Sequence, residues 1–281
     1  MTDFFSAVFL GSAPFLRYAF IAGLISSIPF GIIGTYVVVK RMSYIAGAVS
    51  HSALGGIGLA LFLSSTYNLS FTTPMLGAAV FAIINGLIIS YAIISGQGRV
   101  DTVIGAIWAI GMAIGLIFMA ITPGYVDPMS YLFGNILLIT QLDLTLILLL
   151  NIVVLLFSIL FFNQLLAVSF DAEFAKIRGL NTALFQTMLI LLISITVLLM
   201  ITIVGIVMVI ALLTIPPAVA GLFTRRIKSM ILLSSLLCAL FMTTGLFASY
   251  LLQLPTGSVT ILLAGIVYLL SLGATKLLKK S

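Results

Sequence analysis

Residues 40–58, KRMSYIAGAVSHSALGGIG, contain the only histidine of the 281-residue chain, His51, within the apolar run that follows two basic residues. Residues four apart share one face of a helix, so Gly47 and Gly55 lie on either side of His51. That face presents an imidazole between two bare stretches of backbone, which could admit a neighbouring helix or a small ligand. Ionisable residues at membrane depth usually line a bundle interior or a pathway. His51 is therefore a candidate functional residue, and the alternative is a histidine that only packs by hydrogen bonding.

The composition excludes a soluble protein. Hydrophobic residues make up 63% of the chain and charged residues 6%, and the mean hydropathy is +1.38. Too few charges remain to cover a soluble surface of this size. A membrane span needs about 20 apolar residues, so the chain has room for roughly eight to ten helices and no separate soluble domain. We expect an all-α, polytopic transmembrane bundle that forms one domain over residues 1–281.

Apolar runs bounded by charges, glycine and proline predict about nine spans, and a short interfacial helix before Arg17. The predicted spans are 18–39, 44–63, 72–95, 102–121, 143–167, 183–203, 206–224, 229–250 and 258–275. If the loop at 40–41 is cytoplasmic, every basic residue except Arg17 falls on the same side: Lys40, Arg41, Arg99, Lys176, Arg178, Arg225, Arg226, Lys228, Lys276, Lys279 and Lys280. Short loops rich in lysine and arginine stay in the cytoplasm, which predicts an outside N-terminus and an inside C-terminus.

The acidic residues all fall at span ends or in loops: Asp3, Asp101, Asp127, Asp143, Asp171 and Glu173. Carriers driven by ion gradients usually need a carboxylate within the membrane, so this pattern disfavours a secondary carrier. No lysine follows a glycine, which excludes a P-loop. A zinc protease of the HExxH type is disfavoured because Ser52 and Ala53 follow His51. The chain is therefore expected to be no enzyme and to receive energy from a separate ATPase.

The connection at 170–181, FDAEFAKIRGLN, predicts a short cytoplasmic helix between the fifth and sixth spans. Its signals are an N-cap, an acid in the first turn, bases in the last turn and a C′ glycine: Asp171, Glu173, Lys176, Arg178 and Gly179. Phe174 and Ile177 form an exposed apolar edge. A helix of about eight residues is unstable alone in water. It packs on its own bundle or docks to a partner.

Three other features indicate local structure. Asp127 followed by Pro128 predicts a short helix that ends near Gly134, which is either a gate or lid over an outer cavity or a plain turn. The adjacent prolines at 216–217 are expected to bend or break the seventh span. The glycines at 111 and 115 form a GxxxG pattern that favours close helix packing, and Cys238 is expected to be a buried apolar residue.

Five stretches, in this order, resemble the permease subunits of the ABC-3 family, the zinc and manganese ATP-binding-cassette importers. They are VVVKRMSYIAGAVSHSALGGIGLAL, VDTVIGAIWAIGMAIGL, YVDPMSYLFGNILLIT, DAEFAKIRGL and VGIVMVIALLTIPPAVAGLFTRR. The resemblance implies a multi-pass protein of the bacterial inner membrane with a type II importer-like fold. It also implies a homodimer or heterodimer of permeases, a cytoplasmic ATPase, an extracytoplasmic metal-binding protein and no permanently bound cofactor. The transported ion would be Zn²⁺, Mn²⁺ or Fe²⁺.

The resemblance assigns roles to particular residues. Residues 171–181 match the coupling helix that enters a groove of the ATPase, through Asp171, Glu173, Phe174, Lys176, Ile177, Arg178 and Gly179. The family usually carries an aspartate four residues before the histidine, but this chain has Gly47 there, so only His51 is expected to contact metal. A transient site would then need paired His51 residues across a dimer, or Ser50, Ser52 and backbone carbonyls. The alternatives are a heterodimer half with a degenerate metal site and a secondary metal carrier.

Overall fold

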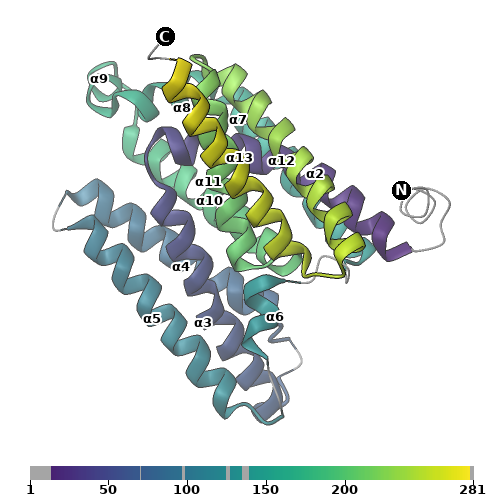
Figure 1. The fold of residues 1–281 in the computed structure, drawn as a ribbon. Coiled ribbons are helices and arrows are strands. Elements are labelled where there is room, and N and C mark those ends of the chain that lie inside the picture. Colours follow the sequence, from purple (N-terminus) through teal and green to yellow (C-terminus); the bar gives the residue numbers. More distant parts are fainter. Residues whose placement is uncertain (1–13, 70, 97–98, 125–126, 135–138, 279–281) are drawn as a thin grey trace. The chain divides into compact units, whose positions relative to one another are not determined.

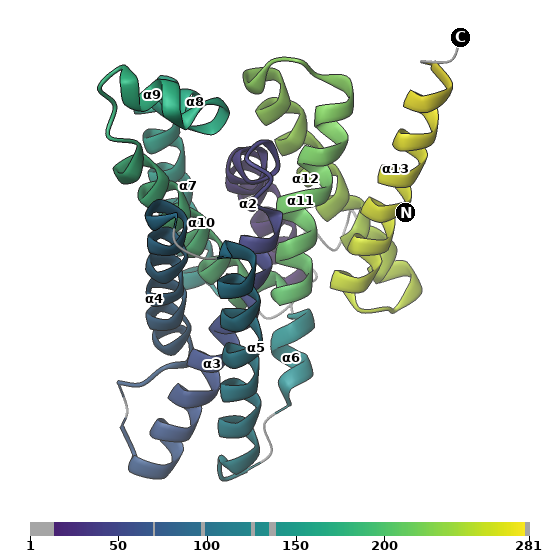
Figure 2. The ribbon, with the colours of Figure 1, turned by 90° about the vertical axis from the view of Figure 1, so that its left-hand side faces the viewer.

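The computed structural model describes residues 14–69, 71–96, 99–124, 127–134 and 139–278, and their regular structure consists of helices (Figures 1 and 2). The helices are α2 (Pro14–Val39), α3 (Ser43–Tyr67), α4 (Pro74–Ser95), α5 (Val100–Ile121), α6 (Pro128–Phe133), α7 (Gln141–Leu160), α8 (Phe162–Phe170), α9 (Ala172–Ile177), α10 (Thr182–Val204), α11 (Ile206–Phe223), α12 (Ile227–Leu252) and α13 (Thr256–Leu278). The predicted interfacial helix before Arg17 lies largely outside the described residues.

Nine helices within the described ranges are long and apolar enough to cross a membrane, which confirms the predicted spans. One boundary was wrong. The fifth span ends at Leu160, and a turn at Phe161 separates it from α8, whereas the sequence predicts a single helix to residue 167. The apolar run continues through this turn without glycine or proline, so its composition gives no stop signal.

The chain divides into two compact units, which are described separately. The first contains the described residues of Met1–Val38, Phe133–Ile159 and Ile203–Ser281, and the second contains Val39–Leu132 and Leu160–Thr202. In the first unit, α11, α12 and α13 pack against one another in every pairing. In the second unit, α3 packs against both α4 and α5, and these three helices lie side by side in Figure 1.

The prolines of the first unit do not break their helix. Helix α11 continues from Ile206 to Phe223 with both prolines inside it, so the predicted bend or break at 216–217 is not a break, and the bend stays a prediction. Pro216 has no N–H for the carbonyl of Leu212, and the Cys238 thiol of α12 donates to that carbonyl instead at 3.6 Å. The buried position of Cys238 is confirmed. Freed carbonyls within a membrane need such partners from neighbouring helices, because no water replaces the lost bond.

Glycines hold α3 and α5 at backbone contact in the second unit. A Cβ added at Gly111 would lie 2.5 Å from Ser52 Cα, and one added at Gly115 would lie 2.6 Å from the Leu54 carbonyl oxygen. Both distances are too short for any side chain, so the GxxxG pattern packs α5 directly on the backbone of α3. The predicted packing role of these glycines is confirmed.

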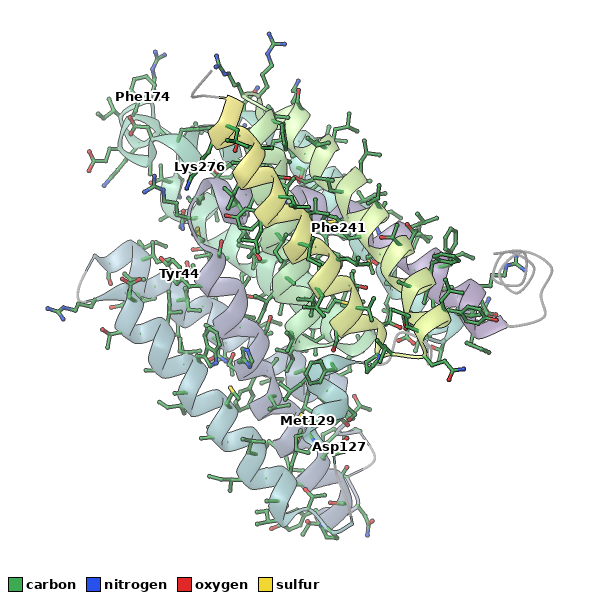
Figure 3. All side chains as sticks on the ribbon, viewed as in Figure 1. Tyr44, Asp127, Met129, Phe174, Phe241 and Lys276 are labelled. Carbon is green, nitrogen blue, oxygen red and sulfur yellow. The ribbon has the colours of Figure 1, made fainter. Side chains whose placement is uncertain are left out.

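Helix α6 is a short helix of six residues, as its sequence predicts. The Asp127 carboxylate accepts a hydrogen bond from the backbone N–H of Met129 at 3.0 Å, and both residues are labelled in Figure 3. The helix ends at Phe133, and Gly134 follows it in the left-handed region at φ +65°. Its role as a gate or lid stays a prediction.

Candidate functional site

His51 lies in the middle of α3, which is the most buried of the nine apolar helices in the described chain. The His51 side chain itself is half-buried. Its Nδ1 atom is buried and has no hydrogen-bond partner among the described residues. A buried polar atom without a partner costs free energy, so it is either strained or kept for a ligand. The alternative interpretation was that His51 only packs, through a hydrogen bond to a neighbouring helix. Its Nδ1 atom makes no such bond to the described residues.

The imidazole ring stacks on the indole ring of Trp108 from α5. The ring centroids are 4.5 Å apart and the ring planes differ by 14°. Trp108 also covers Gly47, because a Cβ added there would lie 3.0 Å from Trp108 Cζ3 and 3.3 Å from Cη2. The position one turn before the histidine is therefore filled by an aromatic ring. A second ligand at position 47 would have to displace that ring.

The space beside Gly55, one turn after His51, is also occupied by protein atoms. A Cβ added at Gly55 would lie 2.7 Å from the Gly111 carbonyl oxygen and 2.8 Å from Phe81 Cε1. Of the two readings that the glycine face left open, the structure shows the neighbouring helix. Helices α4 and α5 therefore cover the bare backbone at Gly47 and Gly55, while the His51 side chain between them remains partly exposed.

The two serines beside His51 differ in their availability. Ser52 Oγ accepts a hydrogen bond from Asn85 Nδ2 at 2.8 Å and donates to the Val49 carbonyl at 3.1 Å. Ser50 Oγ is buried and has no partner within the described part of the chain. Ser50 is thus the freer of the two hydroxyls.

No group of three or more His, Cys, Asp or Glu side chains lies close enough to hold a metal ion within the described residues. A single imidazole is a weak ligand set for a divalent cation, since stable sites use three or four protein ligands. What the arrangement can offer is a brief contact through one nitrogen, which suits an ion that must leave again.

Helix α9 has the local structure that its sequence predicts. The Asp171 carboxylate accepts from the backbone N–H of Phe174 at 2.9 Å. At the other end, the Gly179 N–H donates to the Lys176 carbonyl at 3.0 Å and the Leu180 N–H donates to the Ala175 carbonyl at 3.1 Å. These two bonds form a Schellman motif, and Gly179 has the positive φ of +83° that the motif requires. Both helix ends are therefore closed by local bonds.

The side chains of α9 divide into a buried and an exposed set. Ala175 is buried, while Phe174 is 52% exposed and Ile177 is 84% exposed. Figure 3 shows Phe174 on the outer surface of this segment. The Arg178 guanidinium lies 5.1 Å from the centre of the Phe174 ring. Glu173 and Lys176 instead line a cavity beside the helix. The predicted apolar edge is confirmed, and its coupling role stays a prediction.

Sequence reasoning missed Trp108, which contacts both His51 and Gly47. One signal could have found it, because Trp108 precedes Gly111 by three residues and so shares the face of α5 that carries the GxxxG pattern. Asn85 was also missed. An asparagine in a largely apolar span indicates a hydrogen bond to a neighbouring helix, and Asn85 makes that bond to Ser52.

Comparison with known proteins agrees with the resemblance found in the sequence. Residues 12–275 match the family described as ABC 3 transport family. The chain is 39% identical to an uncharacterized membrane protein of Synechocystis sp., over 92% of this chain and 90% of that protein. It is 31% identical to the manganese import system permease protein ScaB of Streptococcus gordonii, over 92% of this chain and 90% of that protein.

The fold is also similar to a solved structure. The chain superposes on PsaBC from Streptococcus pneumoniae in complex with Fab with a TM-score of 0.82 and 30% identity, covering 96% of this chain and 94% of that chain. The family match spans nearly the whole sequence. The chain therefore belongs to the ABC 3 transport family, and it is a multi-pass protein of the bacterial cell membrane rather than an enzyme.

Proposed function

We propose that this chain is the permease subunit of an ATP-binding-cassette importer for a divalent transition metal. Mn²⁺ is the first ion to test, because a relative that matches nearly the whole chain is named as a manganese import permease. Imidazole also binds Zn²⁺ and Fe²⁺, so these ions are the competitors. In this proposal residues 1–281 act as one transmembrane permease domain.

The observation that carries the proposal is the state of His51. An imidazole nitrogen is buried without a partner on the most buried span, in a chain whose relatives import manganese. We infer that the passing ion contacts His51 briefly, with Ser50 as the nearest free hydroxyl in sequence. The single imidazole per chain favours two permease chains around one path, either two copies of this chain or this chain with a different permease.

Energy enters through the 171–181 segment in this proposal. Phe174 and Ile177 present an apolar edge that the described residues leave largely uncovered, and a cytoplasmic ATPase would cover it. Asp171 and Gly179 fix the two ends of the helix, Arg178 lies over the Phe174 ring of the edge, and Glu173 and Lys176 carry charge on the cavity side of the helix. An extracytoplasmic metal-binding protein would deliver the ion to the opposite face. The proposal includes no cofactor that stays bound to the chain.

The test is Mn²⁺ uptake by proteoliposomes that contain this chain, its ATPase and its binding protein. We expect uptake to require ATP and the His51→Ala variant to lose about tenfold or more of the rate, the loss typical of one contact of 1.4 kcal/mol or more. Ser65→Ala, near the exposed end of the same helix, serves as the matched control. Wild-type uptake by His51→Ala would remove His51 from the path.

Three further measurements would separate the alternatives. Uptake that continues without ATP would contradict an ABC importer and favour a secondary metal carrier. The mass of the intact complex would distinguish two copies of this chain from a pair with a second permease. Competition by Zn²⁺ and Fe²⁺ in the same uptake assay would rank the three ions.

A further inference from the structure

The turn between α2 and α3 is held in an unusual conformation. It consists of Lys40, Arg41 and Met42, and it lies between two of the membrane spans. Arg41 has φ +55°, in the left-handed region that residues other than glycine rarely adopt. Such a conformation persists only where the surrounding contacts fix it.

Those contacts come from α8 and α10. Lys40 Nζ donates a hydrogen bond to the Val168 carbonyl of α8 at 3.2 Å and another to Gln186 Oε1 of α10. The amide Nε2 of the same Gln186 lies 3.9 Å from Met42 Sδ as a donor. Gln186 therefore contacts the turn on both sides of Arg41. We refer to Lys40, Met42, Val168 and Gln186 as the Lys40 clasp.

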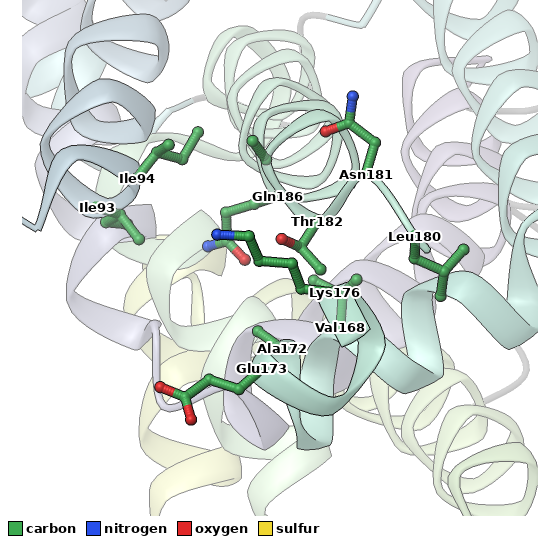
Figure 4. Close-up of a pocket in the computed structure, with 11 residues that line it drawn as sticks. Ile93, Ile94, Val168, Ala172, Glu173, Lys176, Leu180, Asn181, Thr182 and Gln186 are labelled. Atoms are coloured by element: carbon green, nitrogen blue, oxygen red, sulfur yellow. The ribbon is translucent and has the colours of Figure 1, made fainter. Parts of the chain in front are cut away.

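The clasp joins the two helices that flank α9 in the sequence. Val168 precedes the N-cap of α9 by three residues, and Gln186 lies in the second turn of α10. A cavity of about 490 Å³ is lined by residues of both the clasp and α9. Val168 and Gln186 line it from the clasp, and Glu173 and Lys176 line it from α9 (Figure 4).

The other side of the clasp leads directly into α3. Helix α3 begins at Ser43, the residue after Met42. His51 lies eight residues further on, or about 12 Å along the helix axis. A displacement of the clasp therefore moves the start of the helix that carries the imidazole, because an α-helix of this length is stiff along its axis.

The bonds of the clasp are expensive to break. Lys40 is partly buried, and this burial lowers the pKa of its ammonium from the ordinary value of 10.5 to about 8. An ammonium in that position depends on its two carbonyl acceptors in place of water. Gln186 is itself buried, at 8% exposure. The turn is thus expected to move with α8 and α10 as one body.

We propose that the Lys40 clasp transmits movement of the coupling helix α9 to α3, which makes Lys40 a positioning residue for metal transport. This inference rests on the proposed function, since it requires α9 to be the segment that the ATPase moves. Loss of the clasp would leave α9 attached to the ATPase but would disconnect it from α3. ATP hydrolysis would then continue without a matching movement of the ion.

The experiment measures ATP hydrolysed per Mn²⁺ taken up, in proteoliposomes that contain the complete transporter. In Lys40→Met, we expect wild-type ATPase binding and hydrolysis and an increase of about tenfold in ATP used per ion, the size typical of losing a charge-assisted hydrogen bond. Gln186→Glu keeps an acceptor for Lys40 and is expected to stay near the wild-type ratio. The matched control is Arg99→Met, an exposed basic residue in the turn before α5.

The outcomes are distinct from those of the proposed function. An assembled Lys40→Met transporter with the wild-type ratio would overturn the clasp while leaving the proposed function intact. A wild-type complex that takes up none of Mn²⁺, Zn²⁺ and Fe²⁺ with ATP would contradict the proposed function itself. If Lys40→Met does not assemble, Gln186→Leu carries the same test, because it removes one acceptor and leaves Lys40 the Val168 carbonyl.

Discussion

Helices α3 and α9 belong to the same compact unit, but opposite kinds of contact determine their structures. Helix α3 packs through glycines against α4 and α5 and is buried along most of its length. Helix α9 has six residues, is closed by bonds at its ends, and leaves Ile177 84% exposed. The internal contacts of α3 maintain the fold, whereas the uncovered side chains of α9 can serve a partner. Changes to the two helices should therefore have different effects.

The largest effect is expected from charges on the exposed edge of α9. The double variant Phe174→Asp/Ile177→Asp should weaken ATPase binding by about a hundredfold, because apolar anchors of an interface often contribute 2 kcal/mol or more. Thermal unfolding of the isolated chain should hardly change, since both side chains are exposed. Co-purification of the ATPase measures the effect, and Arg99→Ala is the control. An ATPase that still binds at wild-type strength would exclude α9 as the docking site.

The next largest effect concerns packing of α3 against α5. Gly111→Ala should destabilise the chain by about 1–3 kcal/mol, the usual cost of overpacking, because the new Cβ would lie 2.5 Å from Ser52 Cα. Gly105→Ala on the same helix is the matched control, since nothing lies within 4 Å of its added Cβ. Thermal unfolding in detergent compares the two variants. Equal midpoints would show that the backbone contact does not stabilise the fold.

A smaller effect is expected where Trp108 covers Gly47. Gly47→Ala should cost under about 1 kcal/mol, because its Cβ would meet Trp108 at 3.0 Å and a shift of a few tenths of an ångström relieves the contact. The same substitution should cost nothing in a Trp108→Ala background. Unfolding midpoints of the wild type, both single variants and the double variant form the cycle. Additive effects would mean that the two residues do not interact.

An effect of pH, rather than of a substitution, is expected from the titration of Lys40. Its pKa of about 8 in the folded chain lies below the ordinary value of 10.5, so the unfolded chain holds the proton over a range where the folded chain has released it. The free energy of unfolding should therefore rise between pH 8 and 10.5. Melting of the wild type and of Lys40→Met at pH 7.5 and 9.5 tests this, and the wild type should gain relative to the variant. If the melting temperatures of the wild type and of Lys40→Met change by the same amount between the two pH values, the lowered pKa of Lys40 is contradicted.

The spans and the two short helices could be predicted from the sequence because their signals are local. Apolar length predicts each crossing, and Asp127, Asp171 and Gly179 mark helix ends whatever the rest of the fold does. The exposed edge of α9 follows from the same local pattern. The resemblance to the family supplied what these signals could not, which is the expected role of that edge.

The errors and omissions involve partners that are distant in the sequence. No break occurs at 216–217, and the partner of the Leu212 carbonyl, Cys238, lies on another helix. The stack of Trp108 on His51 joins two spans, and the spacing of Trp108 from Gly111 indicates its face of α5 but not its partner on α3. In the sequence, Lys40 indicates only on which side of the membrane its loop lies. Its two hydrogen-bond acceptors belong to α8 and α10, which are distant in the chain. Tertiary packing decides these contacts, and composition cannot.

The stack between His51 and Trp108 gives the chain a built-in optical reporter. Trp108 is the only tryptophan of the sequence. All tryptophan fluorescence of the purified chain therefore comes from the indole ring that stacks on His51. A paramagnetic ion such as Mn²⁺ that reaches this histidine would quench that emission, and the quenching would disappear in His51→Ala. Arrival of the ion can thus be followed in real time without any attached dye.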